Sequence, residues 1–291
     1  MAKFVLLALV VFNLSFSGEK VFNVMGTYMI VDTPSYQYDI YRYVSHLDGL
    51  LSDYKEDSEI TRLNSSSGKD CVDISRETLE VLKKSIEVSE LTFGAFDVTV
   101  GAITINYKRK GILSFQDAKR VVNYRDLKID GSKACLLREG MAVDLGGIGK
   151  GYTVQKAYEK FRDKLKKGFI SIAGDLKVWG QKRSIGVYNP ITKGVLAKLV
   201  NRLDVCLSTS GNYFQDHIIG NQTDILQITV AGDDCGYVDA ISTAIFAMDR
   251  DIRAKFLRDN NGFGVLILYK DGSVWFNKKF SEYFSLIQIG E

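Results

Sequence analysis

The chain has 291 residues and a net charge of only +3, a balance that gives no electrostatic reason to expect a nucleic-acid partner. Hydrophobic residues make up 46% of the sequence and charged residues 25%, which is typical of a globular protein and excludes a largely disordered chain. The length allows one large or two modest domains with a full hydrophobic core.

The first 17 residues follow the order of a signal peptide. Lys3 precedes an apolar run from Phe4 to Phe12, and small residues follow at Ser15 and Ser17. The apolar run is too short to span a bilayer. We expect cleavage after Ser17, export to the periplasm or beyond, and a mature chain, residues 18–291, that does not span a membrane. A buried N-terminal strand is the alternative.

The first half of the mature chain combines short strands with helices. Residues 21–31 are strand-like on either side of Met25-Gly-Thr27. Apolar side chains at helical spacing predict one helix ending near Ser52 and a second over residues 79–91, with Ser75 as its N-cap. Residues 114–117 resemble a capping box before a further short helix.

Two side chains in this half stand out from their neighbours. Tyr54 is an aromatic residue in a polar loop, where it is either half-buried or free to stack on a planar ring. Asp97 lies in an apolar segment, residues 92–101, that we interpret as a strand. Because a carboxylate buried without partners is costly, Asp97 has to be exposed, hydrogen-bonded or functional.

A glycine-rich turn occupies the middle of the chain. Residues 127–145 predict strands broken at 130–132 and 139–140, and four glycines then lead into a helix of about five turns starting at Ile148. Glycines before a helix expose backbone N–H groups that favour a phosphate. The spacing matches neither the Rossmann nor the P-loop motif, so a tight turn without ligand is the alternative.

The second half is rich in strands. Residues 169–230 contain several adjacent β segments, residues 238–248 form a helix, and residues 262–276 form a hairpin turning at Asp271-Gly272. Helices interspersed with mostly adjacent strands predict an α+β fold with mixed or antiparallel sheets and packed helices.

Candidate residues for chemistry are few in this half. Asp239 and Thr243 are four residues apart on one helix face and form a hard-oxygen pair suited to Mg²⁺, unless Asp239 only complements the helix dipole. His217, beside an aspartate, is either a general base or a structural histidine. Residues 208–212 offer hydroxyl and amide donors to a phosphate, or form a simple turn.

The four cysteines form no zinc-like pair. Each lies among apolar neighbours, so we expect mostly small buried side chains, and three disulfide connectivities stay open. The four are Cys71, Cys135, Cys206 and Cys235.

Motifs in collinear order along almost the whole mature chain resemble the ApbE-type flavin transferases, also called FAD:protein FMN transferases. The motifs are Met25-Gly-Thr27, Ser52-Asp-Tyr54, Ser58-Glu-Ile-Thr-Arg-Leu-Asn64, Gly94-Ala-Phe-Asp-Val-Thr-Val-Gly101, Asp144-Leu-Gly-Gly-Ile-Gly-Lys-Gly151, Ala173-Gly-Asp175, Thr209-Ser-Gly-Asn-Tyr213, Asp216-His-Ile218 and Val238-Asp-Ala-Ile-Ser-Thr-Ala244. Four positions depart from the family pattern, namely Val98, Ala173, Asp216 and the turn at 220–223.

The resemblance implies one ApbE-like domain over residues 18–291, built from two intertwined lobes, with FAD and Mg²⁺ bound in one site. It assigns seven residues to the FAD pocket, with Tyr54 stacking on the isoalloxazine: Met25, Tyr54, Ala95, Phe96, Asp97, Asp144 and Lys150. It assigns the metal to Asp239, Thr243 and the backbone carbonyl of Gly147, and makes Asp239 and His217 the catalytic residues.

The implied reaction is Mg²⁺-dependent transfer of FMN from FAD to a threonine hydroxyl of an extracytoplasmic redox protein, with release of AMP. Two alternatives are an FAD pyrophosphatase, which gives FMN and AMP, and a protein that stores FAD without turnover. The departures at Asp216 and Gly220 motivate the last of these.

Overall fold

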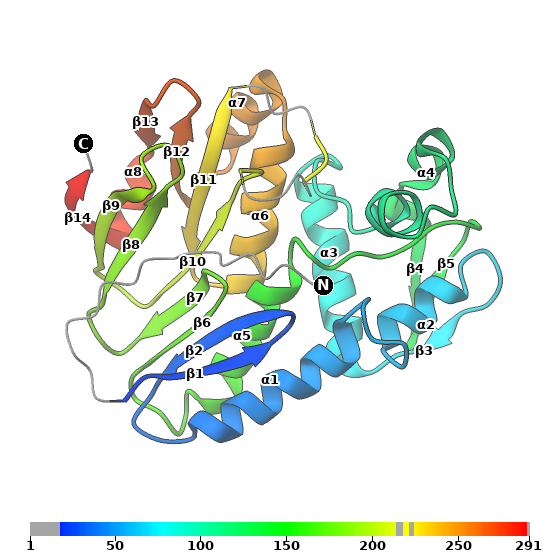
Figure 1. Cartoon of the computed structure of the whole chain (residues 1–291), viewed down its shortest axis with the longest axis horizontal. Helices are drawn as coiled ribbons and strands as arrows, with labels where there is room; N and C mark the ends of the chain where they lie inside the picture. Colours follow the sequence, from blue (N-terminus) through cyan, green and yellow to red (C-terminus); the bar gives the residue numbers. More distant parts are fainter. Residues whose placement is uncertain (1–17, 214–217, 221–223, 290–291) are drawn as a thin grey trace.

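The structure, a computed structural model, describes residues 18–213, 218–220 and 224–289 (Figure 1). The predicted signal peptide, residues 1–17, and His217 lie outside these described residues. Within them, no helix has the length and apolar character needed to cross a membrane.

An eight-stranded antiparallel sheet forms the centre of the molecule, with the spatial order β1-β2-β6-β7-β10-β11-β12-β13. The strands are β1 Lys20–Val24, β2 Thr27–Asp32, β6 Gly168–Ile172, β7 Asp175–Trp179, β10 Val205–Ser210, β11 Ile225–Gly232, β12 Gly264–Tyr269 and β13 Val274–Phe276. The interruption expected at Met25-Gly-Thr27 is a hairpin turn that joins β1 to β2, with positive φ angles at Met25 and Gly26, as a two-residue type I′ turn requires.

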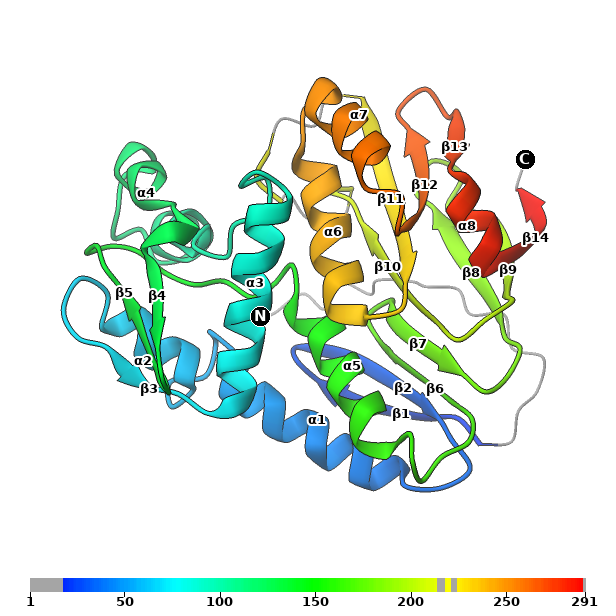
Figure 2. The same ribbon diagram turned by 180° about the vertical axis from the view of Figure 1, so that it is seen from behind.

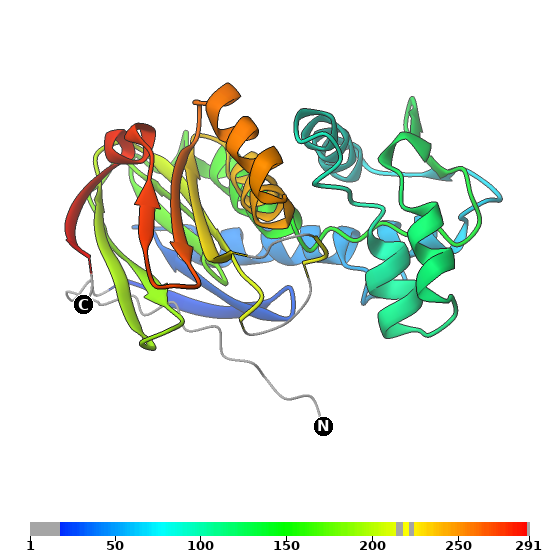
Figure 3. The same cartoon turned by 90° about the horizontal axis from the view of Figure 1, so that it is seen from above.

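Both faces of this sheet are buried. On β6, Ile170 and Ile172 belong to the core under the helices, whereas Phe169 belongs to a second core on the opposite face, because neighbouring side chains in a strand alternate. A three-stranded sheet and a short helix close that second core, giving the layers in Figure 3. These elements are β8 Ser184–Asn189, β9 Gly194–Asn201, β14 Phe284–Ile289 and α8 Lys278–Tyr283.

Helices cover the first face of the sheet, where α5 and α6 lie side by side (Figure 2). The long helices are α1 Gln37–Leu51, α3 Arg76–Leu91, α5 Gly149–Phe161, α6 Cys235–Ala247 and α7 Arg250–Asp259. The apolar stripe predicted for α1 is fully buried, and Ser75 caps α3 by accepting a hydrogen bond from Thr78 N. Amphipathic patterning and capping therefore located α1 and α3 correctly.

A smaller lobe lies beside the helices (Figure 1). Its sheet has the order β3-β5-β4 and is antiparallel. Its elements are α2 Glu59–Ser65, β3 Val72–Asp73, the π-helix η1 Ala102–Arg109, α4 Phe115–Val121, the 3₁₀ turn η2 Tyr124–Asp126, β4 Leu127–Asp130 and β5 Lys133–Leu136. The predicted cap of α4 is present, since Ser114 Oγ accepts from Asp117 N.

The α+β prediction with antiparallel sheets is confirmed, but several segments differ from expectation. The strand expected at 92–101 is wrong because Phe93 and Gly94 have positive φ angles and turn the chain, and the π-helix begins directly afterwards. Residues 141–145 form no strand and make only an isolated bridge between Ala142 and Val100. Strand β7 and the helices α7 and α8 were not expected.

The cysteines form two disulfides, a pairing that the sequence left open, and the expectation that most of them are buried is wrong. Cys71 pairs with Cys135, and Cys206 pairs with Cys235. Cys206 and Cys235 are buried, but Cys71 is exposed. The partners are 64 and 29 residues apart, so tertiary structure and not local sequence brings them together.

Candidate functional site

A cleft of about 940 Å³ opens among the β1–β2 turn, the π-helix, the glycine turn before α5, and α6. Every described residue that the resemblance assigned to FAD or metal lines this cleft: Met25, Tyr54, Ala95, Phe96, Asp97, Asp144, Gly147, Lys150, Asp239 and Thr243. These residues come from segments spread over more than 200 positions of the chain, so the fold brings them together in one place.

Tyr54 stands at the mouth of the cleft with 80% of its surface exposed. The Arg109 guanidinium lies 4.0 Å from the centre of its ring, and Arg109 in turn pairs with Asp53 at 2.5 Å. A cation held over one face of an aromatic ring restrains the ring. The tyrosine is therefore a partly fixed, accessible platform on which a planar molecule can stack.

The inner wall of the cleft combines apolar groups with the Asp97 carboxylate, whose oxygens are hydrogen-bonded within the protein. Phe96 is 4% exposed. The oxygens of Asp97 accept hydrogen bonds from the backbone and hydroxyl of Thr99, at 2.8 and 2.6 Å, and from Tyr124 N at 2.8 Å. Burial raises the pKa of Asp97 against the opposing effect of these bonds. Asp97 thus stabilises the local turn, and its predicted contact with a cofactor stays a prediction.

The glycine turn leads into α5, whose own N-cap residue provides no side-chain hydrogen bond. Asp144 Oδ1 accepts from Gly146 N at 2.8 Å and its Oδ2 accepts from Thr104 Oγ1, which shapes the turn. Ile148, the N-cap of α5, supplies no capping hydrogen bond. Gly149 N donates to Leu145 O at 2.7 Å and Gly151 N donates to Asp239 Oδ2 at 2.9 Å. Lys150 N and the positive end of the helix dipole are therefore what the start of α5 offers to an anion.

A lysine lies between two buried carboxylates behind this turn. Lys150 Nζ is 2.8 Å from Asp175 Oδ2, while Asp175 and Asp239 are 4% and 3% exposed. Burial lowers the pKa of Lys150, but the Asp175 and Asp239 carboxylates outweigh it, so the pKa rises above its ordinary value. Burial, then Asp175, raises the pKa of Asp239 to about 7. A cation beside Asp239 would therefore stabilise its charged form.

The predicted metal ligands offer only oxygen atoms and lie close together. Asp239 and Thr243 are one turn apart on α6, and a Cβ built on Gly147 would lie 3.1 Å from Thr243 Oγ1. Among the described residues there is no cluster of three or more acidic, histidine or cysteine side chains. This donor set fits Mg²⁺, which takes one or two carboxylates and completes its shell with water and phosphate oxygens.

Several groups of the site escaped the sequence analysis. Arg109 belongs to a basic run that resembles a solvated surface, and Asp175 opens a strand that was not expected. Ser208 Oγ donates to Asp175 Oδ1, and Ser208 and Ser242 are in hydroxyl contact at 3.2 Å. Asp175, Ser208 and Ser242 do lie in segments noted in the sequence, namely Ala173-Gly-Asp175, residues 208–212 and Val238-Asp-Ala-Ile-Ser-Thr-Ala244. Their mutual contacts join separate elements and leave no local pattern.

A second cavity, of about 770 Å³, lies between α7 and the β12–β13 hairpin. Arg253 and Asp224 line it, and none of the residues predicted for FAD or metal does. We therefore place the candidate site in the first cleft.

The sequence profile of the ApbE family matches residues 25–267 of this chain. The FAD:protein FMN transferase of Vibrio cholerae serotype O1 is 26% identical over 273 residues, covering 83% of this chain and 81% of that protein. The FAD:protein FMN transferase of Haemophilus influenzae is 23% identical over 278 residues, covering 83% and 80%. The solved structure of the flavin transferase ApbE from Vibrio cholerae superposes with a TM-score of 0.79 at 22% identity, covering 91% of this chain and 98% of that chain.

Proposed function

Because the chain belongs to the ApbE family, we propose that it is an FAD:protein FMN transferase, which moves FMN from FAD to a threonine hydroxyl of an acceptor protein and releases AMP. The observation that supports this proposal most is the set of residues that line one cleft. A stacking platform at Tyr54, the ammonium of Lys150 in the first turn of α5, and the Asp239–Thr243 oxygen pair all line it. FAD presents a planar ring, which can stack on Tyr54, and a diphosphate, which can bind the cationic and metal-binding groups.

The chain's own residues divide the binding of FAD between them. Tyr54 stacks on the isoalloxazine, while Met25, Ala95 and Phe96 line the wall beside it. The amide and the ammonium of Lys150, at the positive end of the α5 dipole, face the diphosphate. Asp239, Thr243 and the carbonyl of Gly147 would hold Mg²⁺, which neutralises charge on phosphoryl oxygens when bound.

The transfer step needs little covalent chemistry from the protein. The threonine Oγ of the acceptor attacks the FMN phosphorus, the bond from that phosphorus to the AMP oxygen breaks, and AMP departs. The hydroxyl proton passes to a base, for which we propose His217, outside the described residues. Lys150 and the positive end of the α5 dipole stabilise the negative charge that the leaving phosphate carries.

We also propose that the protein acts outside the cytoplasm, on an exported redox protein that becomes flavinylated on threonine. The order of charge and apolar residues in the first 17 positions supports this location. Fractionation of cells that produce the full chain, followed by N-terminal sequencing, tests it. A mature N-terminus near Gly18 in the exported fraction is expected, and an intact chain in the cytoplasm would contradict the proposal.

Product analysis tests the activity itself. The purified protein is incubated with FAD and Mg²⁺, with or without an apo acceptor domain that is known to carry FMN on threonine. We expect AMP only when acceptor is present, together with acceptor that has gained FMN. AMP and free FMN without acceptor would identify a pyrophosphatase, and bound FAD without any AMP would identify a storage protein.

A further inference from the structure

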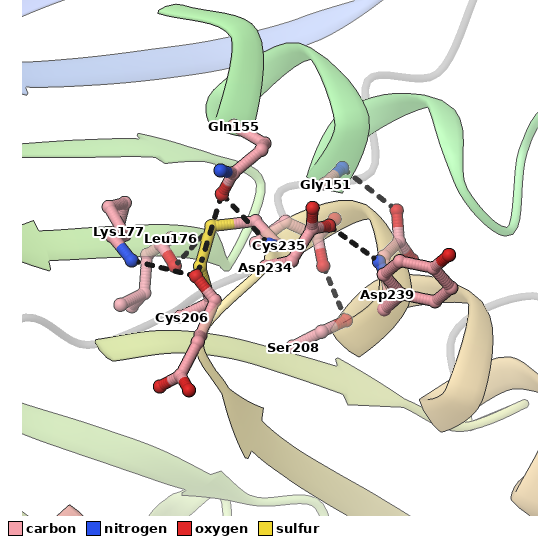
Figure 4. Close-up of a disulfide and its surroundings, with 12 residues drawn as sticks. Gly151, Gln155, Leu176, Lys177, Cys206, Ser208, Asp234, Cys235 and Asp239 are labelled. Carbon is pink, nitrogen blue, oxygen red and sulfur yellow. Dashed lines mark hydrogen bonds between the residues drawn. A yellow bond between two sulfur atoms is a disulfide. The ribbon is translucent and has the colours of Figure 1, made fainter. Parts of the chain in front are cut away.

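The Cys206–Cys235 disulfide joins the two elements that carry the inner end of the cleft (Figure 4). Cys206 lies on β10, three residues before the first cleft-lining residue of that strand, Thr209. Cys235 is the first residue of α6, one turn before Asp239. Both cysteines are buried, with 0% and 2% exposure. The bond therefore ties the base of the metal-binding helix to the strand beside it.

Above the disulfide, α5 and α6 are connected by two hydrogen bonds one helical turn apart (Figure 4). Cys235 N donates to Gln155 Oε1 at 3.1 Å, and Gly151 N donates to Asp239 Oδ2 at 2.9 Å. Residues four apart share a face of a helix, so Gln155 and Gly151 on α5 meet Cys235 and Asp239 on α6 in register. Cys206 Sγ lies 3.8 Å from the same Gln155 oxygen.

On its other side α6 meets β10 through hydroxyl groups. Cys206, Ser208 and Ser210 alternate along β10 and share one face of it. Ser208 Oγ and Ser210 Oγ lie 3.2 and 2.6 Å from Ser242 Oγ on α6, and Ser208 also donates to Asp175. A slip of α6 along β10 would break these contacts and move Asp239 away from its partners.

We propose that the Cys206–Cys235 disulfide is a positioning element for the site, because it fixes the register of α6 against β10 and α5 and thereby holds Asp239 against Gly151 N. Each hydrogen bond adds only a small net free energy to the folded state, whereas the covalent bond at the start of α6 fixes the distance between Cys235 and β10. The effect on metal use rests on the proposed function. The effect on the Gly151–Asp239 contact does not.

The second disulfide provides a matched control. The bond between Cys71, which directly precedes β3, and Cys135 on β5 lies in the smaller lobe, and neither residue lines the cleft. Cys71→Ala/Cys135→Ala removes a disulfide that closes a longer loop and so tests general destabilisation. Cys206→Ala/Cys235→Ala tests positioning.

The first measurement is amide hydrogen exchange at Gly151, followed by NMR in the full mature protein without ligand. We expect exchange about tenfold faster in Cys206→Ala/Cys235→Ala and unchanged in Cys71→Ala/Cys135→Ala. Gln155→Leu keeps the disulfide and removes one hydrogen bond, so we expect a smaller acceleration. That variant tests the same contact network if the double alanine variant does not fold. Equal exchange in every variant would overturn the proposal.

The second measurement is the Mg²⁺ concentration that gives half-maximal AMP release from FAD with acceptor. We expect this Mg²⁺ concentration to rise about tenfold in Cys206→Ala/Cys235→Ala. In the control variant, Cys71→Ala/Cys135→Ala, we expect the thermal stability to fall and the Mg²⁺ concentration to stay constant. A fall in stability of both variants with identical Mg²⁺ requirements would contradict positioning. If the unmodified protein releases no AMP, the proposed function fails, and the exchange experiment still decides the inference.

Discussion

Gly151 N donates a hydrogen bond to Asp239 Oδ2 at 2.9 Å, across the interface between α5 and α6. The two helices approach so closely that a Cβ on Gly151 would lie 2.5 Å from the Cβ of Asp239 and 2.2 Å from the carbonyl oxygen of Cys235. The glycine turn and α6, which carries the predicted metal ligands, thus meet at one contact, which sets the position of the Asp239 carboxylate.

Gly151→Ala should disrupt this contact. Because the new methyl group overlaps backbone atoms of α6, we expect a loss of about 2 to 3 kcal/mol in the free energy of unfolding and a large loss of activity. Gly149→Ala is the control on the same helix, since its Cβ would meet only Leu145 and Met25 at 3.4 and 3.9 Å. Urea unfolding of both variants checks this, and equal stability of the two would contradict the close approach.

Asp239→Asn should abolish stabilisation by Mg²⁺. In the presence of FAD, Mg²⁺ at ten times its dissociation constant should stabilise the unmodified protein by about 1.4 kcal/mol, or a few degrees in melting temperature. The variant should show no such shift, because it lacks the carboxylate, while its amide oxygen still accepts from Gly151. Asp251→Asn, at an exposed position on α7, should behave like the unmodified protein. A Mg²⁺ shift preserved in Asp239→Asn would exclude this residue as a ligand.

Sequence patterns correctly predicted the features that depend on the spacing of residues within one helix. The stripe of α1, the cap of α3 and the spacing of Asp239 and Thr243 on α6 were all predicted, because each lies within one helix. The hydrogen bond from Tyr124 N to Asp97 was not predictable, since Tyr124 is 27 residues away in the sequence. The disulfides likewise depend on contacts between elements. The lysine at 150 was assigned to a cofactor by resemblance alone, and only the structure reveals its ion pair with Asp175.

Tyr54→Ala should weaken FAD binding. Loss of a stacking ring is expected to cost about 1.4 kcal/mol, or a tenfold rise in the dissociation constant measured by quenching of flavin fluorescence. Tyr54→Phe retains the ring and should bind FAD within about twofold of the unmodified protein. If both variants bind equally well, the ring at Tyr54 does not contact flavin.

The Asp224–Arg253 pair should make stability depend on pH. Burial would raise the pKa of Asp224, but the hydrogen bonds and charge of Arg253, at 2.6 and 2.8 Å, hold it below its usual range. A carboxyl with a lowered pKa in the folded state contributes stability above its unfolded pKa of about 3.9, and this is lost as pH falls through the folded value.

Asp224→Asn should therefore destabilise the protein by about 2 kcal/mol at pH 7, because Arg253 is only 4% exposed and loses its counter-charge. The difference from the unmodified protein should shrink below pH 4. Asp259→Asn, exposed on the same helix as Arg253, should cost little at either pH. Urea unfolding at pH 7 and pH 3 measures both variants, and a difference that does not change with pH would contradict the assignment.

The mass of the acceptor protein tests the central claim most directly. After incubation with FAD, Mg²⁺ and the mature chain, intact-mass analysis should show an acceptor heavier by FMN minus one water, in a yield equal to the AMP released. Replacement of its target threonine by alanine should abolish both. An acceptor of unchanged mass, with or without release of AMP, would contradict transfer of FMN by this cleft.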